Sequence, residues 1–423
     1  MNNILRVLRL DKYDKSNSFL NLVRDLFLTT FIGGIASFLS YVFNFIAANK
    51  LPEDSFSTFS GVVGVIYLIQ IPSLTLQTYF TNLVAKDEHF FKKNNFTIFA
   101  KKTYIISVLG VLLVLIASPV ISAYMDIPLK YFMITALMVF GFIYSPVMRG
   151  ILLGLKKIDL FNILGLLEAF LKLLIFLIAL NVTSDPSWVI VAFSLPALLV
   201  GIVAHLVVQK TPGVMDAGKE VAGRFLVNAR YLMITIFTFL FYSAPFSIGV
   251  MLIRHENRAS YAALALLGKI VYFASVMASS VLFRYFSGIT DRRTKNKYLY
   301  LGVAMNIAIS LSIVIVYIFF TEPIVEAMFA GKYTEMIPLV APLALGMVFY
   351  STAFSFVNLF LSDHKIVQVY LLGFATLVQI ILYSIFNETL NDAVMNQVIT
   401  FILIFVLMSV YWSMDQFKAQ KLK

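Results

Sequence analysis

The chain has 423 residues, of which 60% are hydrophobic and 13% charged, and its formal net charge is +11. A water-soluble protein of this length cannot bury so much apolar surface, so the composition excludes a soluble globular fold. Cysteine is absent, which excludes a disulfide framework, a thiolate nucleophile and a thiolate metal site.

Twelve apolar stretches follow one another along the chain. Each has about 20 residues or more, long enough for a helix to cross the roughly 30 Å hydrocarbon layer of a bilayer. The stretches cover residues 26–48, 57–82, 103–125, 131–153, 160–181, 187–208, 231–253, 260–283, 298–320, 337–361, 366–386 and 393–414. The sequence therefore predicts an all-α integral membrane protein with about 12 transmembrane helices.

Lysine and arginine concentrate at both chain ends and in every second gap between the stretches. The basic gaps contain residues 86–102, 149–157, 210–230, 284–297 and 364–365. The opposite gaps hold only Lys50, Lys130, Arg254, Arg258 and Lys332. Because positively charged loops stay on the cytoplasmic side during insertion, we expect a multi-pass protein of the cell inner (cytoplasmic) membrane with both termini cytoplasmic. This topology accounts for the positive net charge, so we expect no nucleic acid as a partner.

The longest polar gap divides the stretches into two sets of six. Arg24 precedes the first stretch as Arg230 precedes the seventh. Tyr79 and Tyr285, near the ends of the second and eighth stretches, are separated in sequence by the same number of residues as the two arginines. Because six is even, both halves begin on the same side, which favours a parallel repeat with a substrate site between the halves near the midplane. We expect two pseudo-symmetric six-helix lobes.

The expected segments follow from these boundaries. They are a cytoplasmic N-terminal segment (1–24), an N-terminal lobe (25–208), a cytoplasmic linker (209–230), a C-terminal lobe (231–414) and a cytoplasmic tail (415–423).

The gaps are too short to hold a folded catalytic domain. The sequence also contains no phosphate-binding Gly-Lys-Ser/Thr loop, no metal-ligand cluster and no Ser/His/Asp pattern. We therefore expect a protein that is not an enzyme and has no catalytic residue, no cofactor and no metal.

Prolines interrupt several stretches, at Pro72, Pro146, Pro196, Pro245, Pro338 and Pro342. A proline frees a backbone carbonyl and bends a helix, so these positions are candidate hinges, with Pro245 the first among them. The alternative is that proline is simply common in membrane helices.

Three ionisable residues fall deep inside the stretches: Glu168, Lys172 and Lys269. Burial at such depth costs about 2.5–3.5 kcal/mol, and such groups usually face a protein interior or an aqueous cavity. Glu168 and Lys172 are four residues apart, so they share a helical face and can pair. That pair leaves Lys269 without a partner, and the surplus positive charge favours an anionic substrate over a cation. Two alternatives stay open for Lys269: it forms an interlobe gate with Glu168, or its side chain extends to the membrane interface.

Four arginines, Arg24, Arg149, Arg230 and Arg284, lie where stretches meet the expected cytoplasmic side. They are ordinary topological charges, or they form a cationic mouth that gathers phosphate from the inner leaflet. With Lys172, Lys269 and Glu168 they complete the set of expected substrate-binding residues.

Three segments resemble a known family. Residues 149–157 with 168–172 look like its basic turn and fifth helix, residues 261–269 like the start of its eighth helix, and residues 322–339 like the link between its ninth and tenth helices. On these motifs the chain resembles the polysaccharide-exporter branch of the multidrug/oligosaccharidyl-lipid/polysaccharide exporter superfamily, the Wzx-like flippases. The seventh stretch departs from the family, because residues 242–246 (YSAPF) replace an Asn/Asp-containing pattern.

The resemblance implies two lobes in a V around a central cavity, and a flippase that moves a polyprenyl-diphosphate-linked oligosaccharide to the outer leaflet by alternating access for surface polysaccharide biosynthesis. The implied partners are the lipid-linked anionic saccharide and membrane lipid. Separately from the resemblance, a monomer is one possibility for the oligomeric state. Two alternatives stay open: a cation-coupled multidrug exporter of the same superfamily, and a non-transport membrane polymerase or scaffold.

Overall fold

The computed structural model describes residues 18–86, 93–155, 157–183, 185–210, 229–288, 291–363 and 365–421. The side chains of residues 18–30 and 276–288, with a few others near helix ends, lie outside this description. The same holds for most of the expected N-terminal segment and for residues 211–228 of the expected linker.

Every predicted apolar stretch is a helix, and the described residues contain no strand, so the predicted all-α fold is confirmed. In chain order the helices are α2 (Ser18–Lys50), α3 (Glu53–Lys86), α4 (Lys93–Met125), α5 (Leu129–Gly154), α6 (Ile158–Val182), α7 (Pro186–Gln209), α8 (Ala229–Leu252), α9 (His255–Gly288), α10 (Arg292–Phe329), the short 3-10 helix η3 (Thr334–Met336), α11 (Ile337–Ser362), α12 (Val367–Ile385) and α13 (Leu390–Lys421). Within the described residues, eleven helices are long and apolar enough to span a membrane, and α9 is the one outside this set.

Several helices extend past the apolar stretches that predicted them. Helix α2 begins at Ser18, inside the expected N-terminal segment, and α13 runs to Lys421, through most of the expected tail. A helix pairs its backbone groups internally, so it can continue into polar surroundings without further partners.

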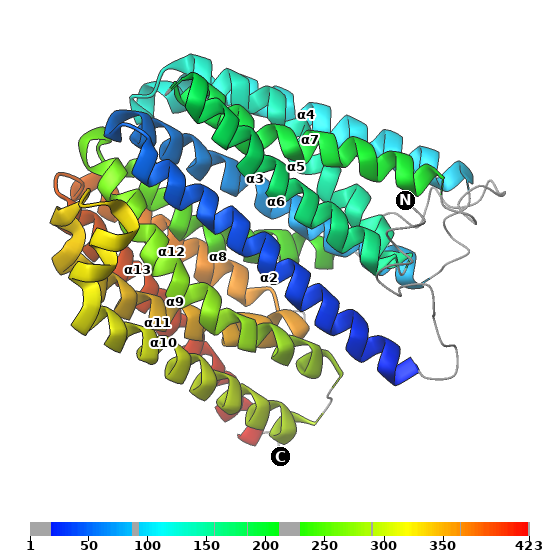
Figure 1. The fold of residues 1–423 in the computed structure, drawn as a ribbon. Helices are drawn as coiled ribbons and strands as arrows, with labels where there is room; N and C mark the ends of the chain where they lie inside the picture. Colours follow the sequence, from blue (N-terminus) through cyan, green and yellow to red (C-terminus); the bar gives the residue numbers. More distant parts are fainter. Residues whose placement is uncertain are drawn as a thin grey trace.

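The helices pack in two sets that follow the chain order. Helices α2 to α7 pack on one another, as do α8 to α13, and α3 lies between the sets because it packs against α5 and α7 on one side and α8 and α9 on the other. Figure 1 shows that α2 begins and α13 ends at the same end of the bundle. We call this the terminal end, and the opposite end the far end.

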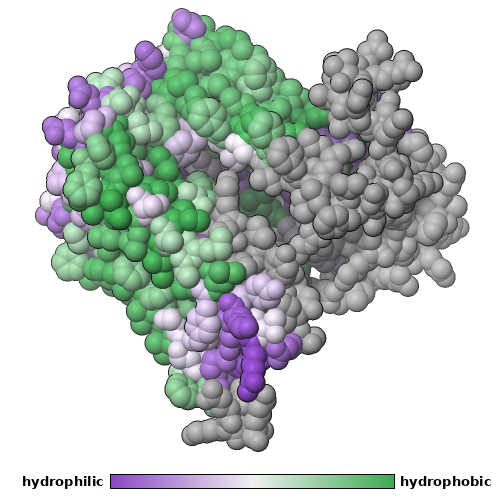
Figure 2. Space-filling view, turned by 60° about the horizontal axis from the view of Figure 1, so that its bottom comes forward, coloured by the Kyte–Doolittle hydropathy of each residue, from purple (hydrophilic) through white to green (hydrophobic). Residues whose placement is uncertain are grey.

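Apolar side chains cover much of the surface in Figure 2. Phe38, Leu113, Ile116 and Phe319 are each more than 60% exposed. Such a surface suits lipid rather than water. The structure is therefore that of a multi-pass membrane protein.

Arg258, on the first turn of α9, joins the two sets at the far end. Its side chain is only 1% exposed. Its guanidinium donates to the carbonyls of Val250 (3.1 Å) and Ile253 (3.3 Å) at the end of α8, and to that of Met125 (2.9 Å) at the end of α4. The last carbonyls of a helix lack partners and carry the negative end of its dipole, so a buried cation is favoured there.

Further polar contacts join the two sets at the same end. Lys332 Nζ donates to the carbonyls of Asn49 (2.7 Å) and Leu51 (3.1 Å), and the Tyr333 hydroxyl donates to that of Ala48 (3.0 Å). The Ser57 hydroxyl donates to the carbonyl of His255 at 2.9 Å. These bonds join the two sets of helices at the far end.

Pro245 lies inside α8, which continues through it, and side chains of α12 bond the carbonyls around it. The carbonyl of Phe241, which would normally bond the amide at position 245, accepts from the Thr376 hydroxyl at 3.3 Å. Gln379 Nε2 donates to the carbonyl of Pro245 at 3.0 Å. Proline at this position is therefore tied to a neighbouring helix, and its role as a hinge stays a prediction.

Candidate functional site

Lys172 lies on the buried face of α6. The buried residues of this helix include Ala169, Lys172, Phe176 and Ala179, which are spaced three and four apart and therefore line one face. A lysine on such a stripe is directed into the protein, and the Lys172 side chain is only 9% exposed.

The predicted ion pair between Glu168 and Lys172 is not formed. Glu168 Oε2 lies 3.2 Å from Nη2 of Arg149, which reaches it from α5, and both side chains are mostly buried. Glu168 and Arg149 both act electrostatically on Lys172, but neither makes an ion pair with it among the described residues. Instead, Lys172 Nζ lies over the ring of Phe193 on α7, 3.9 Å from its centroid.

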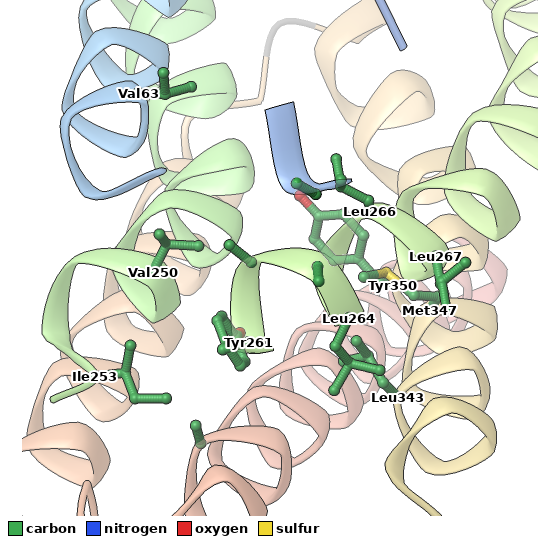
Figure 3. Packing of buried hydrophobic residues seen from close by; sticks show 14 of the residues in the cluster. Val63, Val250, Ile253, Tyr261, Leu264, Leu266, Leu267, Leu343, Met347 and Tyr350 are labelled. Carbon is green, nitrogen blue, oxygen red and sulfur yellow. The ribbon is translucent and has the colours of Figure 1, made fainter. Parts of the chain in front are cut away.

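Lys269 lies at the middle of α9, and the residue before it sets the direction of its side chain. A Cβ on Gly268 would come within 2.7 Å of Met347 and 3.2 Å of Leu343, so α9 touches α11 at this point. Figure 3 shows the same contact, with Leu267 beside Met347 of α11. The next residue, about 100° further round the helix, points away from α11.

Lys269 points toward α3, in the other set of helices. Its Nζ lies 5.0 Å from the centroid of the Tyr67 ring. Within the described part of the chain, no charged side chain pairs with Lys269 or acts electrostatically on it. A hydrogen bond beside the site also crosses between the sets, because the Tyr41 hydroxyl on α2 donates to the carbonyl of Leu266 on α9.

The rings under the two lysines touch each other. The centroids of Tyr67 and Phe193 are 6.0 Å apart and their planes are nearly perpendicular, at 80°. These contacts form one continuous row of four residues, in the order Lys172, Phe193, Tyr67 and Lys269. The row has a lysine of the first set of helices at one end and a lysine of the second set at the other. We call these four residues the two-lysine site.

The two-lysine site carries more positive charge than its surroundings neutralise. Glu168 pairs with Arg149 and also acts electrostatically on Lys172, whereas Lys269 has neither kind of contact with a carboxylate among the residues described. Three cations therefore share one carboxylate. This excess of positive charge in a low-dielectric interior attracts anions.

The remaining predicted site residues are not brought together with the lysines. Arg230 is the second residue of α8, near the terminal end, and is exposed. Arg24 and Arg284 belong to helices α2 and α9, but their side chains lie outside the described residues. The predicted cationic mouth stays a prediction for these three, and Arg149 is engaged with Glu168.

Sequence reasoning missed Tyr67 and Phe193. The chain contains 21 tyrosines and 40 phenylalanines, so no single aromatic residue stands out. Their role emerges only from the positions of the lysines, because the contacts join α6 with α7 and α9 with α3.

The fold is similar to those of solved transporters. A multidrug resistance MATE family transporter of the MOP superfamily, in an inward-facing conformation, superimposes with a TM-score of 0.73 and 14% sequence identity, covering 90% of this chain and 95% of the other. The lipid II flippase MurJ, in an inward closed conformation, gives a TM-score of 0.73 and 13% identity, covering 92% and 87%. An outward-facing conformation of a MATE family transporter gives a TM-score of 0.60 and 16% identity, covering 95% and 96%.

No protein-family model matches the chain, and no curated protein sequence matches it. At these identities the likeness establishes the fold, which is the two-lobe fold of MOP superfamily transporters. These neighbours are transporters and a flippase.

Proposed function

We propose that the protein is a flippase that moves a polyprenyl-diphosphate-linked oligosaccharide from the inner to the outer leaflet by alternating access, for surface polysaccharide biosynthesis. The observation that carries the proposal is the two-lysine site, where each set of helices contributes one buried lysine without a carboxylate partner among the described residues. A diphosphate supplies the missing negative charge to both.

The arrangement of the lysines supports alternating access. Because Lys172 belongs to α6 and Lys269 to α9, an anion held by both would be held between the two sets of helices. The far end is closed by Arg258, Lys332 and Tyr333, so a substrate would enter from the terminal end. The lipid II flippase MurJ offers a precedent for a lipid-linked substrate on this fold.

The membrane potential supplies a direction. If the terminal end is cytoplasmic, as the charge distribution predicts, the bound diphosphate would move outward. An anion leaving a negative interior gains about 2.3 kcal/mol per charge per 100 mV. Net positive charge at the midplane would oppose a cationic drug, which argues against the multidrug alternative.

The proposal is tested by reconstitution. Purified protein in liposomes should move a fluorescent polyprenyl-diphosphate oligosaccharide between leaflets, as measured by the fraction that a membrane-impermeant quencher bleaches. A polyprenyl alcohol carrying the same saccharide and fluorophore but no phosphate should move much more slowly. Equal rates for the two lipids would overturn the diphosphate proposal, and transport of a cationic drug alone would favour the multidrug exporter.

A further inference from the structure

The two lysines are held by rings where ion pairs would be expected. A buried lysine is ordinarily stabilised by a carboxylate, but here the described contacts of Lys172 and Lys269 are with the faces of Phe193 and Tyr67. A ring attracts a cation through the negative potential of its face, and the attraction grows when both groups are removed from water.

A ring and a carboxylate have different consequences for an anionic ligand. A carboxylate would neutralise the ammonium group and would itself repel a phosphate. A ring carries no net charge, so it fixes the position of the ammonium group and leaves its full charge to act on the ligand. An ammonium group has three N–H donors, so one side can rest on a ring while the others bind phosphate oxygens.

The contact between the rings couples the two positions. Phe193 is 2% exposed and also packs against Phe43, Phe59 and Phe142, so its ring is fixed within the first set of helices. Tyr67 touches Phe193 edge to face and receives Lys269 from the second set. The ring pair therefore sets where both ammonium groups stand relative to each other.

We propose that Tyr67 and Phe193 are positioning residues that hold the ammonium groups of Lys269 and Lys172 at the two ends of one ring pair, so that the site prefers a diphosphate over a monophosphate. This inference rests on the proposed function, because it assigns the rings a role toward the same anion. A diphosphate carries more negative charge and more acceptor oxygens than a monophosphate, so two ammonium groups on one ring pair favour the diphosphate.

The ring at position 193 can be weakened without changing its shape. Phe193 is replaced by mono-, di- and trifluorophenylalanine, since each fluorine lowers the negative potential of the ring face. Dissociation constants are measured for farnesyl diphosphate and farnesyl monophosphate in the purified, full-length protein. The matched control is the same series at Phe142. Its ring centroid lies 6.3 Å from that of Phe193, but it lies under no lysine in the described contacts.

The expected result is a stepwise loss of the diphosphate preference with each fluorine at position 193, to about a tenth of its original value with three, and no change at position 142. For the second ring, Tyr67→Phe should keep the preference and Tyr67→Leu should lower it. A preference that is unchanged or increased by fluorination at position 193 would overturn the positioning role.

The lysine variants separate the two ideas. If the unaltered protein prefers the diphosphate and Lys269→Gln abolishes that preference while the fluorinated proteins retain it, the inference fails and the proposed function stands. If the unaltered protein binds both ligands equally, the proposed diphosphate site fails, and the positioning role fails with it.

Discussion

Arg149 and Glu168 form an ion pair between α5 and α6, with Nη2 and Oε2 3.2 Å apart. Glu168 therefore pairs with Arg149 and not with Lys172, which follows it by one helical turn. The Lys172 ammonium group lies over the ring of Phe193. The net charge of the interior is the same for either pairing, but this pairing leaves Lys172 as well as Lys269 without an ion pair.

The Arg149–Glu168 pair should be structural. Breaking it with Glu168→Gln leaves a mostly buried guanidinium without its counter-charge, so the free energy of unfolding should fall by about 1–3 kcal/mol. The double variant Arg149→Glu with Glu168→Arg should recover much of this loss. Thermal unfolding in detergent measures both, and a Glu168→Gln protein as stable as the original would contradict the assignment.

Arg258 should hold the far end closed. Arg258→Met removes a cation from three carbonyls at the ends of α4 and α8, and buried carbonyls without partners are costly, so we expect a destabilisation of at least about 2 kcal/mol. The exposed neighbour Arg254, which pairs with Glu388, is the matched control, and Arg254→Met should change little. A cysteine at Ser57 should react faster with a soluble thiol reagent in the Arg258→Met background. If its reactivity stays unchanged while stability falls, Arg258 stabilises the fold without holding the far end closed.

Transport should require the far end to open. Asp54 and His255 face each other across the two sets, with Oδ1 and Nε2 3.5 Å apart, and the chain has no native cysteine. A short bis-methanethiosulfonate crosslinker that joins Asp54→Cys to His255→Cys should stop flipping, and reduction of the crosslink should restore it. Full activity with the crosslink complete would exclude rocking of the two lobes.

Orientation is tested with two exposed positions at opposite ends. Lys297, on the first turns of α10, marks the terminal end, and Glu388, just before α13, marks the far end. Because basic segments are retained in the cytoplasm, a membrane-impermeant thiol reagent added to intact cells should label Glu388→Cys and not Lys297→Cys. The reverse pattern would mean that the termini lie outside.

Substitution of Lys269 distinguishes an anion site from a gate. Lys269→Arg should retain some transport because it keeps the charge, and Lys269→Glu should abolish it at unchanged expression. Recovery of Lys269→Glu by Glu168→Lys would instead indicate that the two residues act as an interlobe gate. The engagement of Glu168 with Arg149 leads us to expect no recovery.

The helices could be predicted from the sequence because each apolar run is long enough to cross a bilayer, where a single segment can pair its backbone groups only as a helix. Lys172 and Lys269 could be found in the same way, since charge is rare at that depth. The partner of Glu168 could not, because the spacing rule for one helix favours Lys172 and carries no information about Arg149 on α5. Nor could the non-helical backbone of Phe320, three residues before Pro323 in α10.

The central claim is that Lys172 and Lys269 bind one diphosphate together. Its most direct test is the dissociation constant of farnesyl diphosphate for Lys172→Gln, Lys269→Gln and the double variant, with exposed Lys130→Gln as the control. We predict that each single variant loses at least about tenfold in affinity, or 1.4 kcal/mol. The double variant should lose less than the product of the two effects, because both lysines contact one ligand. Affinity that is unchanged in the double variant would contradict the account.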